Sequence, residues 1–544
     1  MKRASIIAAV CSVVVLVMSS ATAAPRVSFG RSTADRVPGV HRTTTGIRSA
    51  VAPHRVASAF DCGVNSTLPG TSNTLLDCDS PLPNDEPHLA VDPTNPAHMV
   101  ASSNDYDSCC DEYYTTFDGG ATWSTGNMSV LNKKRTGSDP VTAFDPKHGT
   151  VIHTSLNYGF LKDGESTHGD VVASISTDGG LNWKTPVVVY HGNGADNDPT
   201  QVFNDKDWVA SDTNPSSPYY GRVYVTWSRF LSHHGNYNES PIWMASSDDG
   251  GYTWSPAKEI SGSAAFCTFQ TAGPAGQCDE DQASSPVVAP DGTVYVAFIN
   301  GQNSAAWETG KEAENSYLVV KSTDGGASWS APVDAVDMED GKHDLPLNVD
   351  GRQTITGYQL RLWSVGNLAV APNGTLYIAF ADNRAGVHDS PHPVSDMNVY
   401  LVSSSDGGAT WSSPLGVDTG PSDQWFPSVA VNPVTTQVGV LYNDRDPANP
   451  DLYNASLTIE GPTGATKTTV SAAPSDPTNS LFFQAHVKGC QQCALFHGDY
   501  ITLAYGSDGA ANMTWTDMSL VATAINGQPL PHPRNLQFIF YARG

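Results

Sequence analysis

The chain is poor in positive charge and in long apolar runs. Its 544 residues include 29 Lys and Arg against 55 Asp and Glu, which gives a formal net charge of −26. A surface of this sign disfavours nucleic acids and anionic membranes as partners. The apolar run at residues 6–18 is too short to cross a bilayer as a helix, and no run of 18 or more apolar residues follows it. We therefore expect neither nucleic-acid binding nor membrane insertion.

Two common hydrolase signatures are absent as well. The sequence contains no Gly-x-Ser-x-Gly nucleophile elbow and no His-Glu-x-x-His zinc motif. Only 15% of the residues are charged, whereas Gly (48) and Pro (37) are plentiful. No segment has the spacing of a long amphipathic helix, so the composition favours a turn-rich all-β protein.

The N-terminus has the features of an export signal. Lys2 and Arg3 precede the apolar run, and Ala21-Thr22-Ala23 offers the small residues of a cleavage site. We assign residues 1–23 to a signal peptide and expect a secreted, extracellular product. We expect its partners to be glycans or glycoproteins, and we expect it to be a monomer.

Three further segments follow the signal. Residues 24–60 hold six arginines against one acid, Asp35, and few large apolar residues. This composition predicts a disordered basic leader or a pro-segment. Residues 61–83 form a lead-in that is expected to carry a disulfide, and residues 84–544 form the main domain.

One octapeptide occurs five times with the pattern Ser/Thr-x-Asp-x-Gly-x-x-Trp. The copies are TFDGGATW (116–123), STDGGLNW (176–183), SDDGGYTW (247–254), STDGGASW (322–329) and SSDGGATW (404–411). The Asp can accept hydrogen bonds from backbone N–H groups of its own turn, the Gly pair supplies positive φ, and the Trp buries a large apolar surface. The structural Asp residues are Asp118, Asp178, Asp249, Asp324 and Asp406. Five copies indicate a repeat protein.

This octapeptide resembles the Asp-box, or BNR repeat, of sialidases (neuraminidases) and related β-propellers. The resemblance implies a single propeller of four-stranded blades, with each box at the turn between a blade's third and fourth strands. It also implies that the boxes lie on the face away from the active site and serve a structural role.

A second repeat sets the number of blades. It consists of an acidic start, a Pro or small residue, an alternating apolar strand, a short turn and a second strand. Seven segments fit, at 85–105, 138–157, 206–229, 284–300, 366–384, 426–445 and 498–517. We therefore favour seven blades over the six of sialidases. The last strand, 536–542, is expected to close the ring against the first blade.

Candidate catalytic residues gather at one rim of such a ring. The end of each blade's second strand and the start of its first strand share this rim, opposite the box turns. The candidates at these points are the arginines Arg229, Arg384 and Arg445, the acids Asp85, Glu86 and Asp139, and the tyrosine Tyr500.

The sialidase resemblance implies a role for each residue type. Sialidases hold the substrate carboxylate with three arginines, use a Tyr–Glu pair as nucleophile and an Asp as acid/base. By this resemblance the three arginines form a clamp, because guanidinium forks match a carboxylate. Tyr500, Tyr442 or Tyr158 would stand near the axis, and a rim acid with a raised pKa would supply the proton.

The sequence also departs from that family. It has no Arg-Ile-Pro motif, and Asp85-Glu86-Pro87-His88 stands at the corresponding place. No Tyr–Glu pair can be assigned from spacing. Arg384 and Arg445 could instead pair with neighbouring acids such as Asp382 and Asp444.

Three functions therefore stay open. The first is an exported sialidase-like glycoside hydrolase of the exo-α-sialidase type. The second is a non-catalytic propeller that binds glycan or protein. The third is a calcium-dependent glycan-active enzyme, for which residues 279–281 and 204–207 offer acidic oxygens. No cofactor is required by the first reading, although calcium is compatible with it.

Eight cysteines remain once Cys11 leaves with the signal. An even count in an exported chain favours disulfides. The local pairs are Cys62–Cys78 and Cys267–Cys278, and cross-links are expected between the Cys109-Cys110 pair and the Cys490/Cys493 pair. A Cys₄ zinc site and a redox Cys-x-x-Cys are the alternatives for the last four.

Overall fold

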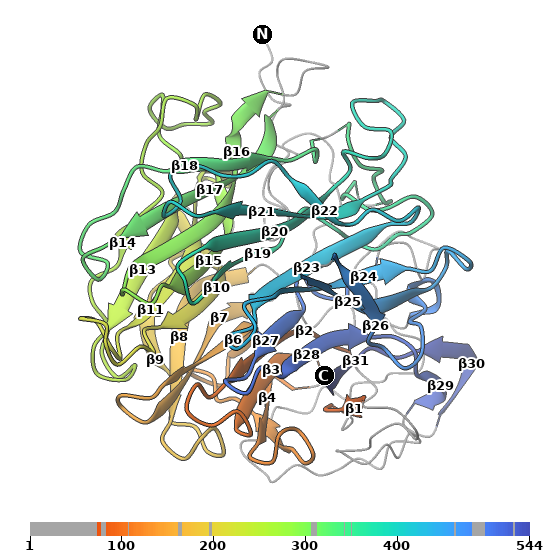
Figure 1. Cartoon of the computed structure of the whole chain (residues 1–544), viewed down its shortest axis with the longest axis horizontal. Helices are drawn as coiled ribbons and strands as arrows, with labels where there is room; N and C mark the ends of the chain where they lie inside the picture. Colours follow the sequence, from red (N-terminus) through yellow and green to blue (C-terminus); the bar gives the residue numbers. More distant parts are fainter. Residues whose placement is uncertain are drawn as a thin grey trace.

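Seven antiparallel sheets follow one another along the chain and form the blades of a β-propeller (Figure 1). The computed structural model describes residues 73–77, 83–106, 108–160, 166–194, 199–305, 313–341, 343–349, 351–461, 464–480, 495–525 and 528–544. The predicted signal peptide, basic leader, most of the lead-in, and Cys62 and Cys78 lie outside these residues. Within them, the only helical segment is the 3-10 turn η2 (Pro477–Asn479).

Each blade is a four-stranded meander. Blade one consists of β2 (Asn84–Val91), β3 (Met99–Asp105), β4 (Asp111–Thr116) and β5 (Ser124–Asn127). Blade two consists of β6 (Arg135–Asp145), β7 (Thr150–Phe160), β8 (Ser166–Ser176) and β9 (Val187–Tyr190). Blade three consists of β10 (Gln201–Ser211), β11 (Val223–His233), β13 (Ile242–Ser247) and β14 (Lys258–Glu259), with β12 (Asn236–Glu239) paired to β11.

The remaining blades repeat this plan. Blade four consists of β15 (Asp281–Val288), β16 (Val294–Ala305), β17 (Ala313–Ser322) and β18 (Val333–Asp337). Blade five consists of β19 (Asn367–Val370), β20 (Leu376–Asp382), β21 (Asn398–Ser404) and β22 (Leu415–Asp418). Blade six consists of β23 (Gln424–Val431), β24 (Val438–Arg445), β25 (Tyr453–Glu460) and β26 (Thr466–Thr469). The predicted count of seven blades is confirmed.

Blade seven joins the two ends of the chain. It consists of β27 (Thr502–Tyr505), β28 (Ala511–Asp517), β31 (Phe538–Arg543) and the N-terminal β1 (Thr74–Leu75). In Figure 1 the orange-red β1 lies among blue strands, and Thr74 pairs with Tyr541. In the sequence, a hairpin of β29 (Val521–Ile525) and β30 (Gln528–Asn535) lies between β28 and β31.

The last strand closes the ring against blade one by packing rather than by strand pairing. Residues 538–543 pair within blade seven, between β28 and β1, rather than with a strand of blade one. The contact with blade one is made by side chains: Ile539 and Tyr541 pack with Leu89 and Met99. Alternate residues of one strand point to opposite faces, so β31 can bond to its own sheet and pack on the next. The outer edge of blade seven is capped by the N-terminal strand.

The five octapeptides form the turns between the third and fourth strands of blades one to five. In the first copy, Asp118 Oδ1 accepts hydrogen bonds from the backbone N–H of Thr122 (2.9 Å) and the hydroxyl of Thr116 (2.8 Å). Gly119 and Gly120 have φ of 74° and 89°. Trp123 donates from Nε1 to the Gly120 carbonyl at 3.1 Å. Local hydrogen bonding and positive φ therefore build the turn, as the sequence predicts.

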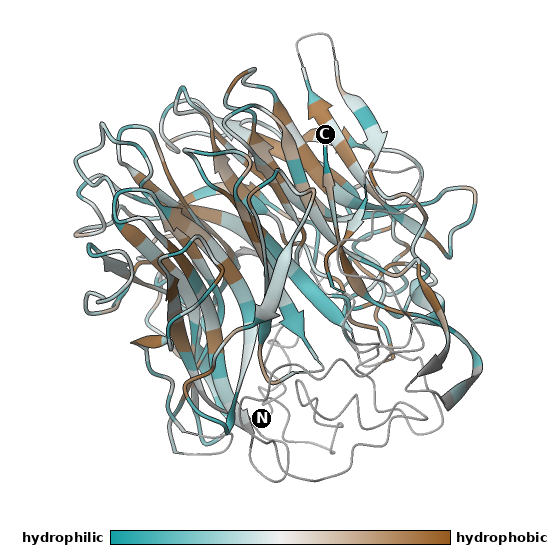
Figure 2. Ribbon diagram, turned by 90° about the horizontal axis from the view of Figure 1, so that it is seen from below, coloured by the Kyte–Doolittle hydropathy of each residue, from teal (hydrophilic) through white to brown (hydrophobic). Residues whose placement is uncertain are grey.

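The apolar core lies between adjacent blades. Figure 2 shows hydrophobic segments concentrated in the strands and hydrophilic ones toward the connecting loops. One cluster joins blades two and three, with Leu156 and Val171 packed with Val225 and the fully buried Trp227. Face-to-face packing of this kind fixes each blade against its neighbours and holds the inner strands around the axis.

Two disulfides are present among the described residues. Cys267 is bonded to Cys278, which confirms that predicted pair. Cys109 is bonded to its neighbour Cys110. The predicted cross-links from this pair to Cys490 and Cys493 are therefore wrong, because each cysteine has its partner next to it in the chain. Cys490 and Cys493 themselves lie outside the described residues.

Candidate functional site

The innermost strands share a bulge where they enter the ring. Pairing of the first two strands slips at this point in blades one, two, three, four and six. The bulged residue has a left-handed backbone in each case: Glu86 (φ 56°), Asp139 (58°), Lys206 (54°), Ala283 (54°) and Phe426 (51°). A non-glycine residue in this region costs roughly 1–2 kcal/mol. Five repeats of one costly conformation indicate that the bulge sets the direction of these side chains, as bulges next to active sites do.

Three consecutive blades place a charged residue at this bulge. Glu86, Asp139 and Lys206 occupy equivalent positions in blades one, two and three, and all three side chains are buried. Glu86 and Asp139 lie close enough to shift each other's pKa. Lys206 lies close enough to stabilise the ionised form of both acids. The equivalent positions of three blades therefore bring two acidic side chains and one lysine close together.

Asn104, at the end of β3, organises these acids. Its Nδ2 donates to Asp85 Oδ1 and to Glu86 Oε2, both at 2.9 Å, and its Oδ1 accepts from the backbone N–H of Asp139 at 2.9 Å. The two carboxyl groups of Asp85 and Glu86 therefore share one amide donor. Glu86 Oε1 also accepts from the backbone N–H of Asp499 at 3.1 Å.

Burial dominates the protonation of the acids. It raises the pKa of Asp85 to about 7, against the lowering effect of the Asn104 hydrogen bond. Burial and the charge of Asp139 raise the pKa of Glu86 well above its ordinary value. Burial also raises the pKa of Asp139, while Lys206 and the Ser138 hydroxyl hold it down. Since two adjacent carboxyl groups cannot both ionise cheaply, this pair favours holding a proton.

Two buried cations stand beside the acids. Lys206 is 3% exposed, its Nζ lies 3.6 Å from the centre of the Tyr500 ring, and it has no hydrogen-bond partner in the described part of the chain. Arg361 is ion-paired through Nη2 with Asp499 and stacks on Phe496 at 4.2 Å. Its Nε and Nη1 are buried and bond to none of the described residues. Unused buried donors of this kind suit an anionic ligand.

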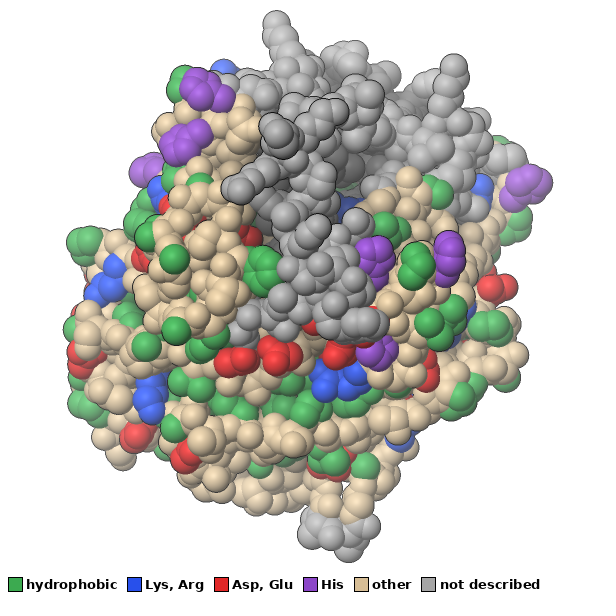
Figure 3. Space-filling view, turned by 90° about the horizontal axis from the view of Figure 1, so that it is seen from above, with side chains coloured by type: hydrophobic (Ala, Val, Ile, Leu, Met, Phe, Trp, Pro, Cys, Tyr) green, Lys and Arg blue, Asp and Glu red, His purple; other side chains and the backbone are tan. Residues whose placement is uncertain are grey.

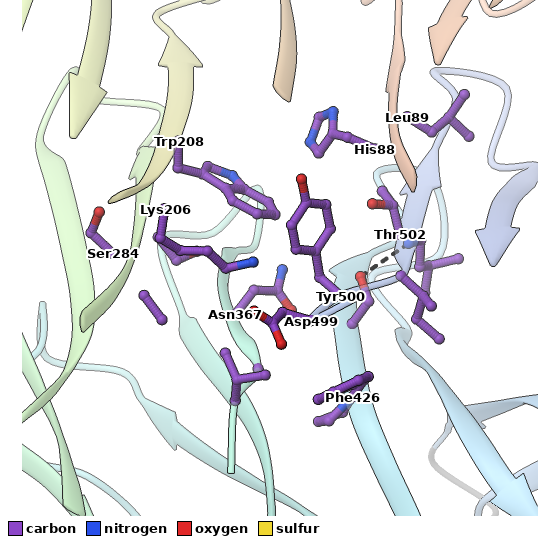
Figure 4. A pocket seen from close by; sticks show the side chains of 18 residues that line it. His88, Leu89, Lys206, Trp208, Ser284, Asn367, Phe426, Asp499, Tyr500 and Thr502 are labelled. Atoms are coloured by element: carbon purple, nitrogen blue, oxygen red, sulfur yellow. Dashed lines mark hydrogen bonds between the residues drawn. The ribbon is translucent and has the colours of Figure 1, made fainter. Parts of the chain in front are cut away.

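A cavity of about 140 Å³ lies in the centre of the ring. Figure 4 shows Lys206, Asp499 and Tyr500 pointing into it, with His88 and Trp208 on one side and Phe426 on the other. On one face of the molecule, acidic side chains lie in a row beside a basic one (Figure 3).

Tyr500 joins these groups in space. Its hydroxyl donates to the Pro140 carbonyl at 3.2 Å, next to Asp139, and its ring packs edge-on against Trp208. Burial and the charges of Glu86 and Asp139 raise the pKa of Tyr500 well above its ordinary value, so the phenol stays neutral. The structure thus brings together four of the predicted candidates: Asp85, Glu86, Asp139 and Tyr500.

The three predicted arginines lie elsewhere, in three separate ion pairs. Arg384 binds the Asp382 carboxylate through Nε (2.9 Å) and Nη2 (2.6 Å) and stacks on Tyr400. Arg445 is paired with Asp423 at 2.8 Å. Arg229 is paired more loosely with Glu239, at 3.6 Å, and stacks on Trp243. Each therefore has a local acid, and the structure does not gather them around one ligand.

In the acidic string at 279–281, each residue has one carboxylate oxygen held by a protein donor. Asp279 accepts from Gln302 Nε2, Glu280 from the backbone N–H of Thr271 at 3.0 Å, and Asp281 from Asn300 Nδ2 at 2.6 Å. Neither this string nor residues 204–207 gathers three ligand atoms around one point in the described part of the chain.

Sequence reasoning missed Lys206 and Arg361 as binding residues. Lys206 had a usable signal, because aligning the repeats at their acidic starts places it level with Glu86 and Asp139. Arg361 had none, because it lies in the long connection between β18 and β19. Its position depends on a tertiary contact, in which its backbone N–H donates to the Leu495 carbonyl at 2.9 Å.

The comparisons with known proteins show low similarity. No protein-family model matches the chain, and no curated protein matches it. Similar solved structures include a leech intramolecular trans-sialidase (14% identity, TM-score 0.39, 71% of this chain and 68% of that one). Others are a Penicillium chrysogenum α-L-arabinanase (14%, 0.41, 66% and 88%) and the NanB sialidase of Streptococcus pneumoniae (8%, 0.40, 82% and 83%). Similarities at these values assign no function to the chain, and membership of the Asp-box family stays a prediction. Among the described residues, no helix is long and apolar enough to cross a membrane.

Proposed function

We propose that the protein is an exported glycoside hydrolase that acts on sugars bearing a carboxylate, with exo-sialidase activity as the preferred form. The observation that carries this proposal is the set of charged residues Glu86, Asp139 and Lys206 at one strained position of three consecutive blades. Strain retained at equivalent positions, with charged side chains turned toward one another, is typical of a functional site.

The two acids divide the chemical roles. The pKa of Glu86 is raised well above its ordinary value, so this residue is suited to protonate the oxygen of the leaving group. Asp139, kept toward its ionised form by Lys206 and Ser138, supplies negative charge for an oxocarbenium-like transition state. Asp85, with a pKa of about 7, is a second group able to exchange a proton near the working pH.

The cations account for the choice of an acidic sugar. Lys206 Nζ and two nitrogens of Arg361 are buried and unused by the described residues. A substrate carboxylate would satisfy these donors, and a neutral sugar would leave them without a charged partner. Tyr500 lies under Lys206 and fixes the direction of its ammonium group. The predicted arginines, already paired with Glu239, Asp382 and Asp423, are not needed for this clamp.

Sugar release from a glycan with a terminal sialic acid, and from the same glycan without it, tests the proposal. We expect release of the acidic sugar only, and a rise in KM of at least about tenfold for the acidic substrate in Arg361→Lys and Lys206→Met. Lys184→Met is the matched control, because Lys184 also lies over a tyrosine ring, that of Tyr252, but on the exposed surface. Glycan binding without release of sugar would reject the hydrolase and leave a binding propeller.

A further inference from the structure

Two connections meet beside blade five. One runs from β18 to β19 and the other from β20 to β21. The backbone N–H of Asn383 donates to the Glu339 carbonyl at 3.1 Å, and that of Ser390 donates to the His343 carbonyl at 3.0 Å. The backbone N–H of Asp389 donates to Asp344 Oδ1 at 2.9 Å. These hydrogen bonds hold the connections in fixed register.

Four side chains with metal-binding chemistry converge at this junction. Glu339 and Asp344 come from the first connection, and His388 and Asp389 from the second. One ligand atom from each lies within 4.8 Å of the others. His388 Nδ1 is 3.0 Å from Asp389 Oδ2 and 3.6 Å from Glu339 Oε2. This spacing is compatible with four ligands around one ion.

The protein alone does not satisfy every polar atom of this group. The Asp389 side chain is only 9% exposed, yet its Oδ1 is buried without a hydrogen-bond partner among the described residues. Asp344 is fully buried. Three carboxylates within reach of one imidazole repel one another, and an unpaired buried carboxylate oxygen is costly. A bound cation removes both penalties at once.

We propose that Glu339, Asp344, His388 and Asp389 bind one divalent transition-metal ion, Zn²⁺ or Mn²⁺. A ligand set of one imidazole and three carboxylates suits these ions, whereas Ca²⁺ prefers oxygen ligands alone. The ion would tie the two connections together. The connection between β18 and β19 continues to Arg361, so the metal would also stabilise the segment that places the Arg361 guanidinium at the ring centre. The site is separate from the acidic strings considered from the sequence, and it does not depend on the proposed hydrolase activity.

Calorimetric titration of the chelator-treated, full-length protein with Zn²⁺, Mn²⁺ and Ca²⁺ tests this site. We expect one equivalent of Zn²⁺ or Mn²⁺ to bind, and the affinity to fall by more than about 100-fold in His388→Ala. Asp389→Asn, which keeps the side-chain shape, should weaken binding as well and serves if His388→Ala fails to fold. His392→Ala is the matched control, because His392 is an exposed histidine of the same connection.

A thermal measurement adds a second readout. Zn²⁺ or Mn²⁺ should raise the melting temperature of the chelator-treated wild type and of His392→Ala, and raise that of Asp389→Asn by less. Binding that is equally strong in His388→Ala and the wild type would overturn the assignment. So would binding of Ca²⁺ alone, or no stoichiometric binding of any of the three ions.

Discussion

The second glycine of the first octapeptide turn offers a sharp test of how the ring closes. Gly120 has φ of 89°, and a Cβ placed there would lie 2.7 Å from Cζ of Tyr541. Tyr541 belongs to blade seven and cannot withdraw easily. Its side chain is buried, its hydroxyl donates to Asn512 Oδ1 at 2.8 Å, and its ring packs against Trp123. Gly120→Ala therefore adds a steric conflict between the first and last blades to the cost of positive φ.

Gly149→Ala isolates the second of these costs. Gly149 has φ of 65° and its added Cβ would meet nothing within 4 Å. We expect about 1–2 kcal/mol of destabilisation for Gly149→Ala from backbone strain alone. Gly120→Ala should cost a further 1–3 kcal/mol, roughly, because overpacking forces a buried side chain to move. Thermal unfolding of both variants at one scan rate measures the difference. Equal losses in the two variants would refute the proposed contact between blades one and seven.

Three other predictions concern stability and covalent structure. Burial raises the pKa of Glu280 to about 7, so the folded state binds this proton more tightly than the unfolded state. The free energy of unfolding should therefore fall by up to about 3 kcal/mol between pH 4.5 and 7. Glu280→Gln should flatten this slope when unfolding is measured as a function of pH. Arg445→Lys should lower the melting temperature, at a cost of about 1–3 kcal/mol, and leave turnover per folded molecule unchanged, because the guanidinium also donates to the Thr356 and Pro450 carbonyls; lost turnover at full stability would contradict this. Non-reducing peptide mapping should yield one peptide with a Cys109–Cys110 disulfide, and free thiols there would count against the structure.

The blade count and the turns could be predicted because their causes are local. The hydrogen bonds of Asp118 reach no further than Thr116 and Thr122. The period-two strands and their short hairpins likewise depend on neighbouring residues. Closure of the ring could not be predicted in the same way. β1 is two residues long, and its partner Tyr541 lies at the other end of the chain.

The candidate site was predictable in part for the same reason. Asp85, Glu86 and Asp139 lie in the first half of innermost strands, and the repeat itself places them at the ring centre. The arginines at strand ends follow a different rule. Arg384 lies two residues from Asp382, and this carboxylate already occupies its guanidinium. The cation that reaches Asp499 instead is Arg361, which a long connection delivers from outside the repeat.

In the proposed reaction, Glu86 protonates the leaving group at the centre of the ring. The most direct test is kcat/KM for release of a carboxylate-bearing sugar by the wild type and by Glu86→Gln, with both proteins shown to be folded. Glutamine can still accept from the Asp499 N–H but has no acidic proton to give. We expect a loss of about 10²–10⁴-fold, the usual contribution of general acid catalysis. Activity within twofold of the wild type in folded Glu86→Gln would contradict the claim.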